Sequence, residues 1–159
     1  MKNFVLAVFT GSLLAAGCSG AAESKGRSRK MGNNAGVQVP VLPSAIKGNF
    51  SDDYGSSYLI SDSQLLQQPG NNYRLVLCDT ASKFIIARND SSNSTEPGLY
   101  TRIDYMFFSG MEPWAWGYCL TVYNAVSDAA AIAAKPADRN NPRKGCNGFP
   151  FTRMKRTTL

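Results

Sequence analysis

The sequence contains no histidine. Its absence removes the commonest general base, and with it every nucleophilic pair in which histidine activates a serine or a cysteine. It also removes the commonest metal ligand, and the cysteines lack the spacing of a zinc site. Two carboxylates could still act as acid and base, but the adjacent Asp52 and Asp53 lie in a predicted turn, where neighbouring side chains diverge. We therefore expect no enzyme, no catalytic residue, no metal and no dissociable cofactor.

Long apolar stretches are also scarce. The sequence has one, and it lies within the first eighteen residues, MKNFVLAVFTGSLLAAGC. Lys2 supplies a positive charge, an apolar run follows from Phe4 to Leu14, and small residues lead to Cys18. A membrane-spanning helix needs about 20 apolar residues, so this run is too short to span. The three-part layout is that of a secretory signal, and we expect the chain to be exported.

The end of this segment, Leu14 to Cys18, resembles the lipobox of bacterial lipoproteins, with Ala15 where leucine is usual. The resemblance implies that residues 1–17 are a cleaved signal peptide, and that Cys18 carries diacylglycerol and an N-acyl chain. Two or three acyl chains hold a protein firmly on membrane lipid. Ser19 replaces the aspartate that retains enterobacterial lipoproteins in the inner membrane, which favours the outer membrane. The alternative is a plain cleaved signal whose cysteine is not acylated.

Charge is spread unevenly over a chain whose net charge is +6. Residues 19–47 hold five basic residues and one acidic, residues 48–124 four basic and eight acidic, and residues 125–159 seven basic and two acidic. This division does not indicate a uniform nucleic-acid-binding face. Residues 18–45, rich in glycine, serine and basic residues, are predicted to form a flexible tether. Residues 46–159 are the size of one globular domain.

From Ile46 onward, short apolar runs of period two alternate with turn residues, which predicts antiparallel strands. The expected strands cover residues 46–50, 58–60, 73–79, 84–89, 99–109 and 114–123. One helix is expected in the alanine-rich run, capped by Ser127 or Asn124 and stopped at Pro136. The fold class is therefore mainly β: an antiparallel meander, closed or nearly closed into a small barrel, with one late helix.

Three details of this pattern can be checked separately. Tyr73, Leu75 and Leu77 are predicted to share one face of their strand. Phe149 to Phe151 is expected to dock on the barrel, followed by a basic tail that frays. Gly48-Asn49-Phe50, followed by a turn and a second strand, is similar to the opening hairpin of lipocalin and avidin-type barrels, with Phe50 in place of their tryptophan.

Three cysteines remain once Cys18 is assigned to lipid: Cys78, Cys119 and Cys146. Three pairings are open in a compartment that permits disulfides. We favour Cys119 with Cys146, because Cys78 falls in an apolar strand-like run where a thiol behaves as a small hydrophobe. On the chain-entropy estimate this bond stabilises the domain by about 3 to 4 kcal/mol.

Candidate binding residues cluster between Tyr105 and Tyr123, where aromatic side chains occur on both faces of two strands. They form either a recognition surface, with Trp114, Trp116, Tyr118 and the basic loop 139–144, or simply core. Arg102 and Asp104 are further candidates, since two residues apart on one strand face they can meet at the barrel mouth or interior. Their alternative is a structural or solvent-facing ion pair.

These observations support two hypotheses of function. The first is a lipid-anchored, non-catalytic binding module of the cell envelope, whose partner is an envelope protein and not nucleic acid. The second is a lipocalin-like carrier of a small apolar ligand. A cavity of several hundred Å³ inside the barrel favours the carrier, and a filled interior favours the surface module.

Overall fold

The computed structural model describes residues 40–158. The predicted signal peptide, Cys18 and most of the predicted tether lie outside these residues. Within the described part, no helix has both the length and the apolar character needed to cross a membrane.

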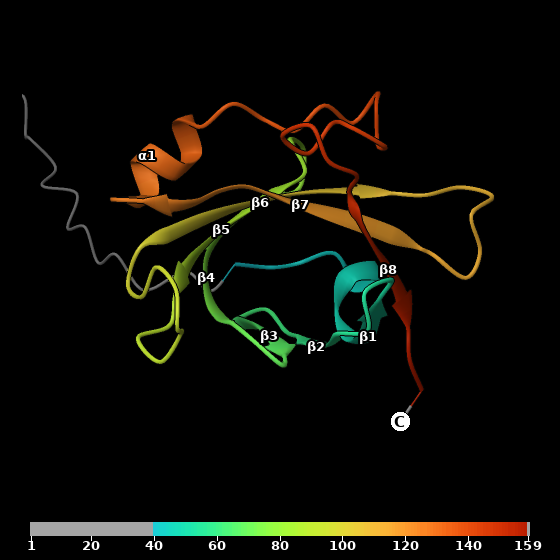
Figure 1. The fold of residues 1–159 in the computed structure, drawn as a ribbon, viewed down its shortest axis with the longest axis horizontal. Helices are drawn as coiled ribbons and strands as arrows, with labels where there is room; N and C mark the ends of the chain where they lie inside the picture. The colour runs from blue at the N-terminus through green and yellow to red at the C-terminus, as the bar shows by residue number, and fades with distance from the viewer. Residues whose placement is uncertain (1–39, 159) are drawn as a thin grey trace, which may run out of the picture. The chain divides into compact units, whose positions relative to one another are not determined.

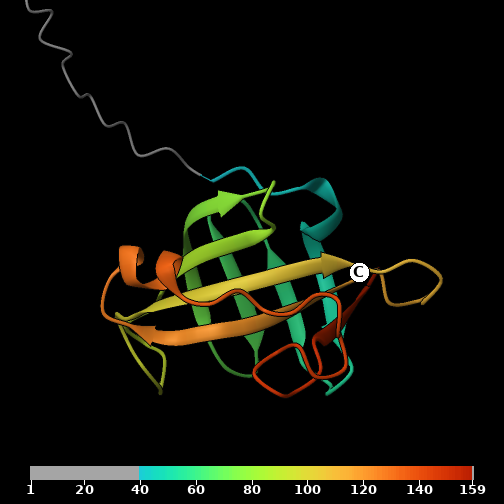
Figure 2. The ribbon, with the colours of Figure 1, turned by 90° about the horizontal axis from the view of Figure 1, so that it is seen from above.

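Eight antiparallel strands close into a barrel in chain order, each paired with the next and the last with the first (Figures 1 and 2). The strands are β1 Gly48–Asp52, β2 Ser57–Ile60, β3 Gln64–Gln68, β4 Asn72–Asp79, β5 Phe84–Asn89, β6 Tyr100–Phe107, β7 Trp116–Ala125 and β8 Thr152–Arg156. The predicted mainly β meander is confirmed, and it closes fully. Closure leaves the barrel wall without an unpaired sheet edge.

Two of these strands differ from the sequence prediction. The basic tail does not fray, because β8 pairs with β7 on one side and with β1 on the other, where Asp52 lies opposite Met154. Met154 is fully buried, whereas its neighbours along β8 are polar. One inward apolar residue gives too weak a pattern to indicate a strand. The polar β3 was missed for the same reason, since Leu65 is the only residue of it that is buried.

The barrel interior is filled by large apolar side chains from every strand. The ring centroids of Phe50 and Trp116 lie 5.4 Å apart, edge to face. The remaining buried members of this core are Leu42, Ile46, Tyr58, Ile60, Leu65, Tyr73, Leu75, Ile85, Ala87, Ile103, Tyr105, Tyr118 and Met154. Interdigitation of this kind supplies most of the stability of a small domain.

The segment that precedes β1 covers one end of the barrel. Its short 3-10 helix η1, Ser44–Ile46, buries Ile46 completely, and Leu42 is also buried in the core. Asp62, in the β2–β3 turn, accepts hydrogen bonds from the backbone N–H of Leu42 at 2.7 Å and from Lys47 Nζ at 3.0 Å. Residues 40–45, which the sequence assigned to the tether, thus include part of the packed domain.

A β-bulge in β4 changes which side chains face inward. The register with β5 shifts between Leu75 and Leu77, so the alternation reverses there. Tyr73 and Leu75 are buried as predicted, but Leu77 is exposed and Cys78 packs against the core instead. The prediction that Leu77 shares their face is therefore wrong. Hydrophobic alternation alone does not reveal an inserted residue.

Residues 126–151, here called the covering segment, pass over the outer faces of β5, β6 and β7 (Figure 1). The segment begins with α1, Asp128–Ala133, whose N-cap is Ser127, with Oγ accepting from the N–H of Ala130 at 3.1 Å. Ala131 of α1 packs on Ile86, and both are fully buried. This cover explains why β5 is apolar on both faces, as its sequence predicted.

Candidate functional site

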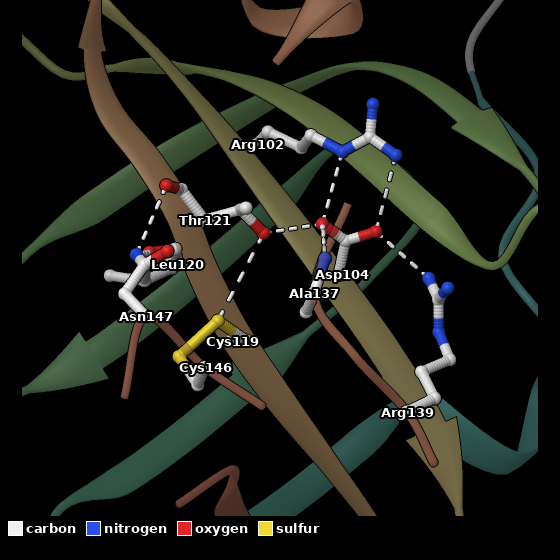
Figure 3. The surroundings of a disulfide bond; sticks show 9 residues. All are labelled: Arg102, Asp104, Cys119, Leu120, Thr121, Ala137, Arg139, Cys146 and Asn147. Carbon is white, nitrogen blue, oxygen red and sulfur yellow. Dashed lines mark hydrogen bonds and ion pairs between the residues drawn. A yellow bond between two sulfur atoms is a disulfide. The ribbon is translucent and has the colours of Figure 1, made fainter. Parts of the chain in front are cut away.

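Arg102 and Asp104 project from the outer face of β6 and are buried beneath the covering segment. Arg102 donates to the Asp104 carboxylate through Nε at 3.0 Å and Nη2 at 3.2 Å. Arg139 adds a bond from Nη2 at 2.8 Å, and the backbone N–H of Ala137 one at 3.3 Å. The Thr121 hydroxyl donates as well (Figure 3). Asp104 thus has all its acceptor positions in use.

This cluster is structural. Asp104 is fully buried and Arg102 is 4% exposed, so neither offers a free group to a ligand. Arg102 Nη1 also donates to the carbonyl of Ile132 at the end of α1, at 2.7 Å. The placement of the pair at the barrel mouth or interior was wrong. The pair fastens the covering segment to the barrel wall, which is the structural alternative.

The disulfide between Cys119 and Cys146 fastens the same segment at a second point (Figure 3). The predicted pairing is confirmed, with Cα atoms 5.4 Å apart, while Cys78 is free. The neighbouring loop is folded so tightly that a Cβ on Gly145 would lie 1.9 Å from the carbonyl oxygen of Asp138. Together the bond and the Asp104 cluster make the covering segment a fixed part of the surface.

Trp116 and Tyr118 lie inside the barrel and not on its surface. They are 2% and 7% exposed, so the expectation that they contribute to an exposed contact surface is wrong. The Tyr58 hydroxyl donates to Asp52 at 2.7 Å and lies 2.9 Å from the Tyr118 hydroxyl. Burial raises the pKa of Tyr58 well above its ordinary value and that of Tyr118 to about 12. Tyr58 and Tyr118 are core residues with hydrogen-bonded hydroxyls, whereas the buried Nε1–H of Trp116 has no hydrogen-bond partner among the described residues.

Asp52 and Asp53 perform separate structural roles. Asp52 Oδ1 accepts from the N–H groups of Tyr54 and Ser56, as a turn-forming aspartate does. Asp53 pairs with Arg153 of β8, with Nε to Oδ2 at 2.8 Å. The two carboxylates have different partners, as expected for neighbours in a turn. Among residues 40–158, no group of three or more cysteine or acidic side chains is placed to hold a metal ion.

Trp114 is the predicted aromatic that does reach the surface. It lies half-buried in the β6–β7 connection, with the Arg153 guanidinium 4.9 Å and the Lys155 ammonium 5.4 Å from its ring centroid. Cations over an indole face are attracted by its electron density. Trp114 therefore holds two basic side chains of β8 in position on the outer wall.

Beside this tryptophan lies a groove of about 690 Å³, here called the β8 groove. Arg153 is shared by the groove and the Trp114 contact. The charged lining residues are Asp53, Arg143 and Arg153. The other lining residues are Tyr54, Phe108, Met111, Pro142, Pro150 and Phe151. They come from the β1–β2 turn, the β6–β7 connection and the covering segment.

Local sequence explains one wall of this groove. Gly117 lies on β7, and a Cβ there would be 2.7 Å from Cζ of Phe108 and 3.0 Å from the carbonyl oxygen of Thr152. The absence of a side chain lets the Phe108 ring lie directly against the strand. Tyr54, at 72% exposed, rises from the β1–β2 turn, and the exposed Pro150 comes from the covering segment. The groove thus has apolar walls that remain open to solvent.

The basic residues of the predicted loop divide between two roles. Arg139 donates to the carbonyl of Tyr105 at 2.9 Å as well as to Asp104, so it is used in packing. Arg143 is exposed and lines the groove. Within the described chain, neither Arg143 nor Lys155 forms an ion pair, whereas Arg153 is paired with Asp53.

Sequence reasoning identified Trp114, the aromatic stretch that contains Phe108 and the loop that contains Arg143, but it missed Tyr54 and Met111 as groove residues. These two residues lie in turns, where no periodicity indicates that three distant segments converge. No protein-family model, curated protein or solved structure matches this chain.

Proposed function

We propose that the protein is an exported, lipid-anchored, non-catalytic binding module of the cell envelope, and that it presents the β8 groove to a partner. The anchor rests on the lipobox resemblance at Cys18, and Ser19 favours the outer membrane by the same resemblance. The binding role rests on one observation above all: a groove whose lining combines apolar side chains with Arg143, which forms no ion pair within the described residues, on a wall fastened by the disulfide and the Asp104 cluster.

Size and rigidity support this assignment. A volume of about 690 Å³ falls in the range of about 300–1,000 Å³ typical of ligand sites. The covering segment that forms one wall is held by the Cys119–Cys146 bond and by the buried Asp104 cluster. A preorganised surface loses little conformational entropy on binding, so more of its contact energy appears as affinity.

The second candidate function, carriage of a small apolar ligand, draws on the closed eight-stranded barrel. Barrels of eight strands have an interior that is either filled by side chains or holds one small ligand. Here Phe50, Tyr105 and Trp116 are each no more than 2% exposed within one packed core. None of these three lines the β8 groove or any of three further cavities of the described residues, although Tyr73 of the core lines two of those cavities. The packing therefore supports the outer groove over the interior.

The test places a photo-crosslinking amino acid in the complete chain, expressed in its own envelope. Position 54 reports on the groove, and position 123 is the matched control, because Tyr123 is also an exposed tyrosine but lies outside it. We expect a discrete adduct of higher mass from position 54 only. Absence of an adduct, or equal adducts from both positions, would contradict the groove as the contact site.

The lipid anchor is tested separately in the same cells, by membrane fractionation. Cys18→Ser removes the thiol that the lipobox resemblance assigns to acylation. We expect the variant to leave the membrane fraction and the crosslink from position 54 to weaken. A variant that stays with the envelope and is processed at the same site would refute the anchor, while leaving the groove to be judged by the crosslink.

A further inference from the structure

The charge of the β8 groove indicates what it binds. Three basic side chains, Arg143, Arg153 and Lys155, lie in or beside it, and Asp53 is the one carboxylate among its lining residues. Asp53 neutralises Arg153 only, at 2.8 Å. Two positive charges therefore face solvent without a partner in the described chain. A partner that brought no negative charge would have to desolvate them without compensation.

The apolar walls add a second requirement. Tyr54 and Met111 are 72% and 38% exposed, and both line the groove. Pro150, on the covering segment that forms one wall, is also exposed and lines the groove. Exposed apolar side chains gathered around a concavity are typical of an interaction site. A purely ionic ligand, such as free phosphate, would leave these side chains in water.

Two kinds of partner combine negative charge with apolar surface: an anionic bilayer and an acidic polypeptide. The shape of the groove distinguishes between them. An anionic bilayer is flat on this scale, and a flat surface cannot contact the walls and the floor of a concave groove at once. A length of polypeptide can enter it and place successive side chains against opposite walls. The barrel is closed, so β8 offers no free strand edge, and recognition must come from side chains and not from strand addition.

We propose that the β8 groove binds an acidic segment of another protein, in which aspartate or glutamate is interspersed with apolar side chains. The acidic groups contact Arg143 and Lys155, and the apolar groups pack between Tyr54, Met111 and Phe108. This inference rests on the proposed function, because it names the partner chemistry of the same groove.

The test measures fluorescence anisotropy with the detergent-purified protein and three labelled heptapeptides. The probe alternates glutamate with leucine and phenylalanine, one control replaces each glutamate by glutamine, and the other replaces each apolar residue by glycine. We expect the probe to bind at least about tenfold more tightly than either control, and the affinity to fall as salt is added. Equal binding of all three peptides, or no binding, would overturn the acidic-segment proposal.

Matched variants locate the binding site. Arg143→Glu with Lys155→Glu should weaken binding of the probe about tenfold or more, since two favourable contacts, one exposed and one half-buried, become repulsive. Arg74→Glu with Lys135→Glu makes the same change of net charge at exposed residues outside the groove, and we expect it to leave binding within about twofold. Equal losses in the two variants would show nonspecific charge attraction and refute the site.

Vesicles separate this proposal from membrane docking. With Cys18→Ser in the background, sedimentation with phosphatidylglycerol-containing and neutral vesicles should give the same small bound fraction. Binding to anionic vesicles that Arg143→Glu with Lys155→Glu abolishes would overturn the peptide proposal in favour of a membrane surface. A crosslink from position 54 together with failure of the peptide would refute the acidic chemistry alone, and failure of both would refute the groove itself.

Discussion

Replacing Asp104 by asparagine tests whether the buried ion cluster holds the covering segment on the barrel. The substitution keeps the size of the side chain but removes its charge and turns one acceptor into a donor. That donor would face the guanidinium groups of Arg102 and Arg139, which now approach within 3.2 Å of the carboxylate. Arg102, 4% exposed, would keep only the carbonyl of Ile132 and the ring of Phe84, 4.0 Å from its Cζ.

The expected magnitude follows from burial. Breaking a buried pair and leaving one charge uncompensated costs about 3–5 kcal/mol, a large part of the about 5–15 kcal/mol that stabilises a typical domain. Asp53→Asn is the matched control, because it makes the same chemical change in a more exposed pair, with Arg153 42% and Asp53 16% exposed. A pair that water reaches contributes about 0–1 kcal/mol. The two variants should thus differ by at least about 2 kcal/mol.

Urea unfolding followed by tryptophan fluorescence measures both, since Trp116 reports on the core. A second variant tests the same reasoning: Arg102→Met with Asp104→Leu removes the two buried charges and leaves Arg139, 25% exposed, on its carbonyl partners. We expect it to be less destabilised than Asp104→Asn. The reasoning would be refuted if Asp104→Asn and Asp53→Asn lost equal stability. It would also be refuted if Asp104→Asn lost less than about 1 kcal/mol.

Three further predictions use other parts of the fold. Replacing Cys119 and Cys146 by serine, 27 residues apart, should lower the unfolding free energy in urea by about 3–4 kcal/mol. Burial raises the pKa of Tyr118 from 10.0 to about 12. The contribution of its neutral hydroxyl to the stability of the fold is therefore complete below pH 10 and is lost as the pH rises through 12. Tyr118→Phe should reduce the fall in melting temperature over that window, and an unchanged fall would contradict it. The Leu42 N–H holds the pKa of Asp62 below its ordinary 3.8, so the contribution of the Asp62 carboxylate to stability is lost in acid. Asp62→Asn should reduce the fall in melting temperature as the pH is lowered; an unchanged fall would argue against this contact.

The strands with strong alternation could be predicted from the sequence, whereas the weak ones could not. β5, β6 and β7 have several apolar residues each, and their positions agree with the structure to within two residues. β3 and β8 bury only Leu65 and Met154 respectively. Their strand conformation depends on neighbours that offer hydrogen bonds on both sides. That information is absent from local sequence.

The candidate site shows the same division. Trp114 and the loop with Arg143 were predicted, because a tryptophan or a cluster of basic residues can be recognised in the sequence without knowing what lies beside it in space. Trp116 was predicted on the same grounds and is core, since it shares the inward face of β7 with Tyr118. The role of Tyr54 depends on the approach of residues about 90 positions away in the covering segment.

By itself the sequence determined the fold class and the helix, and it favoured the pairing of Cys119 with Cys146 among three possibilities, because each depends on residues close in sequence or on a choice among few candidates. Only the tertiary structure decided that Arg102 and Asp104 are buried, that β8 closes the barrel and that a groove forms beside Trp114. The physical reason is common to all three. Burial and convergence depend on what covers a residue, and here the cover comes from segments far away in the chain.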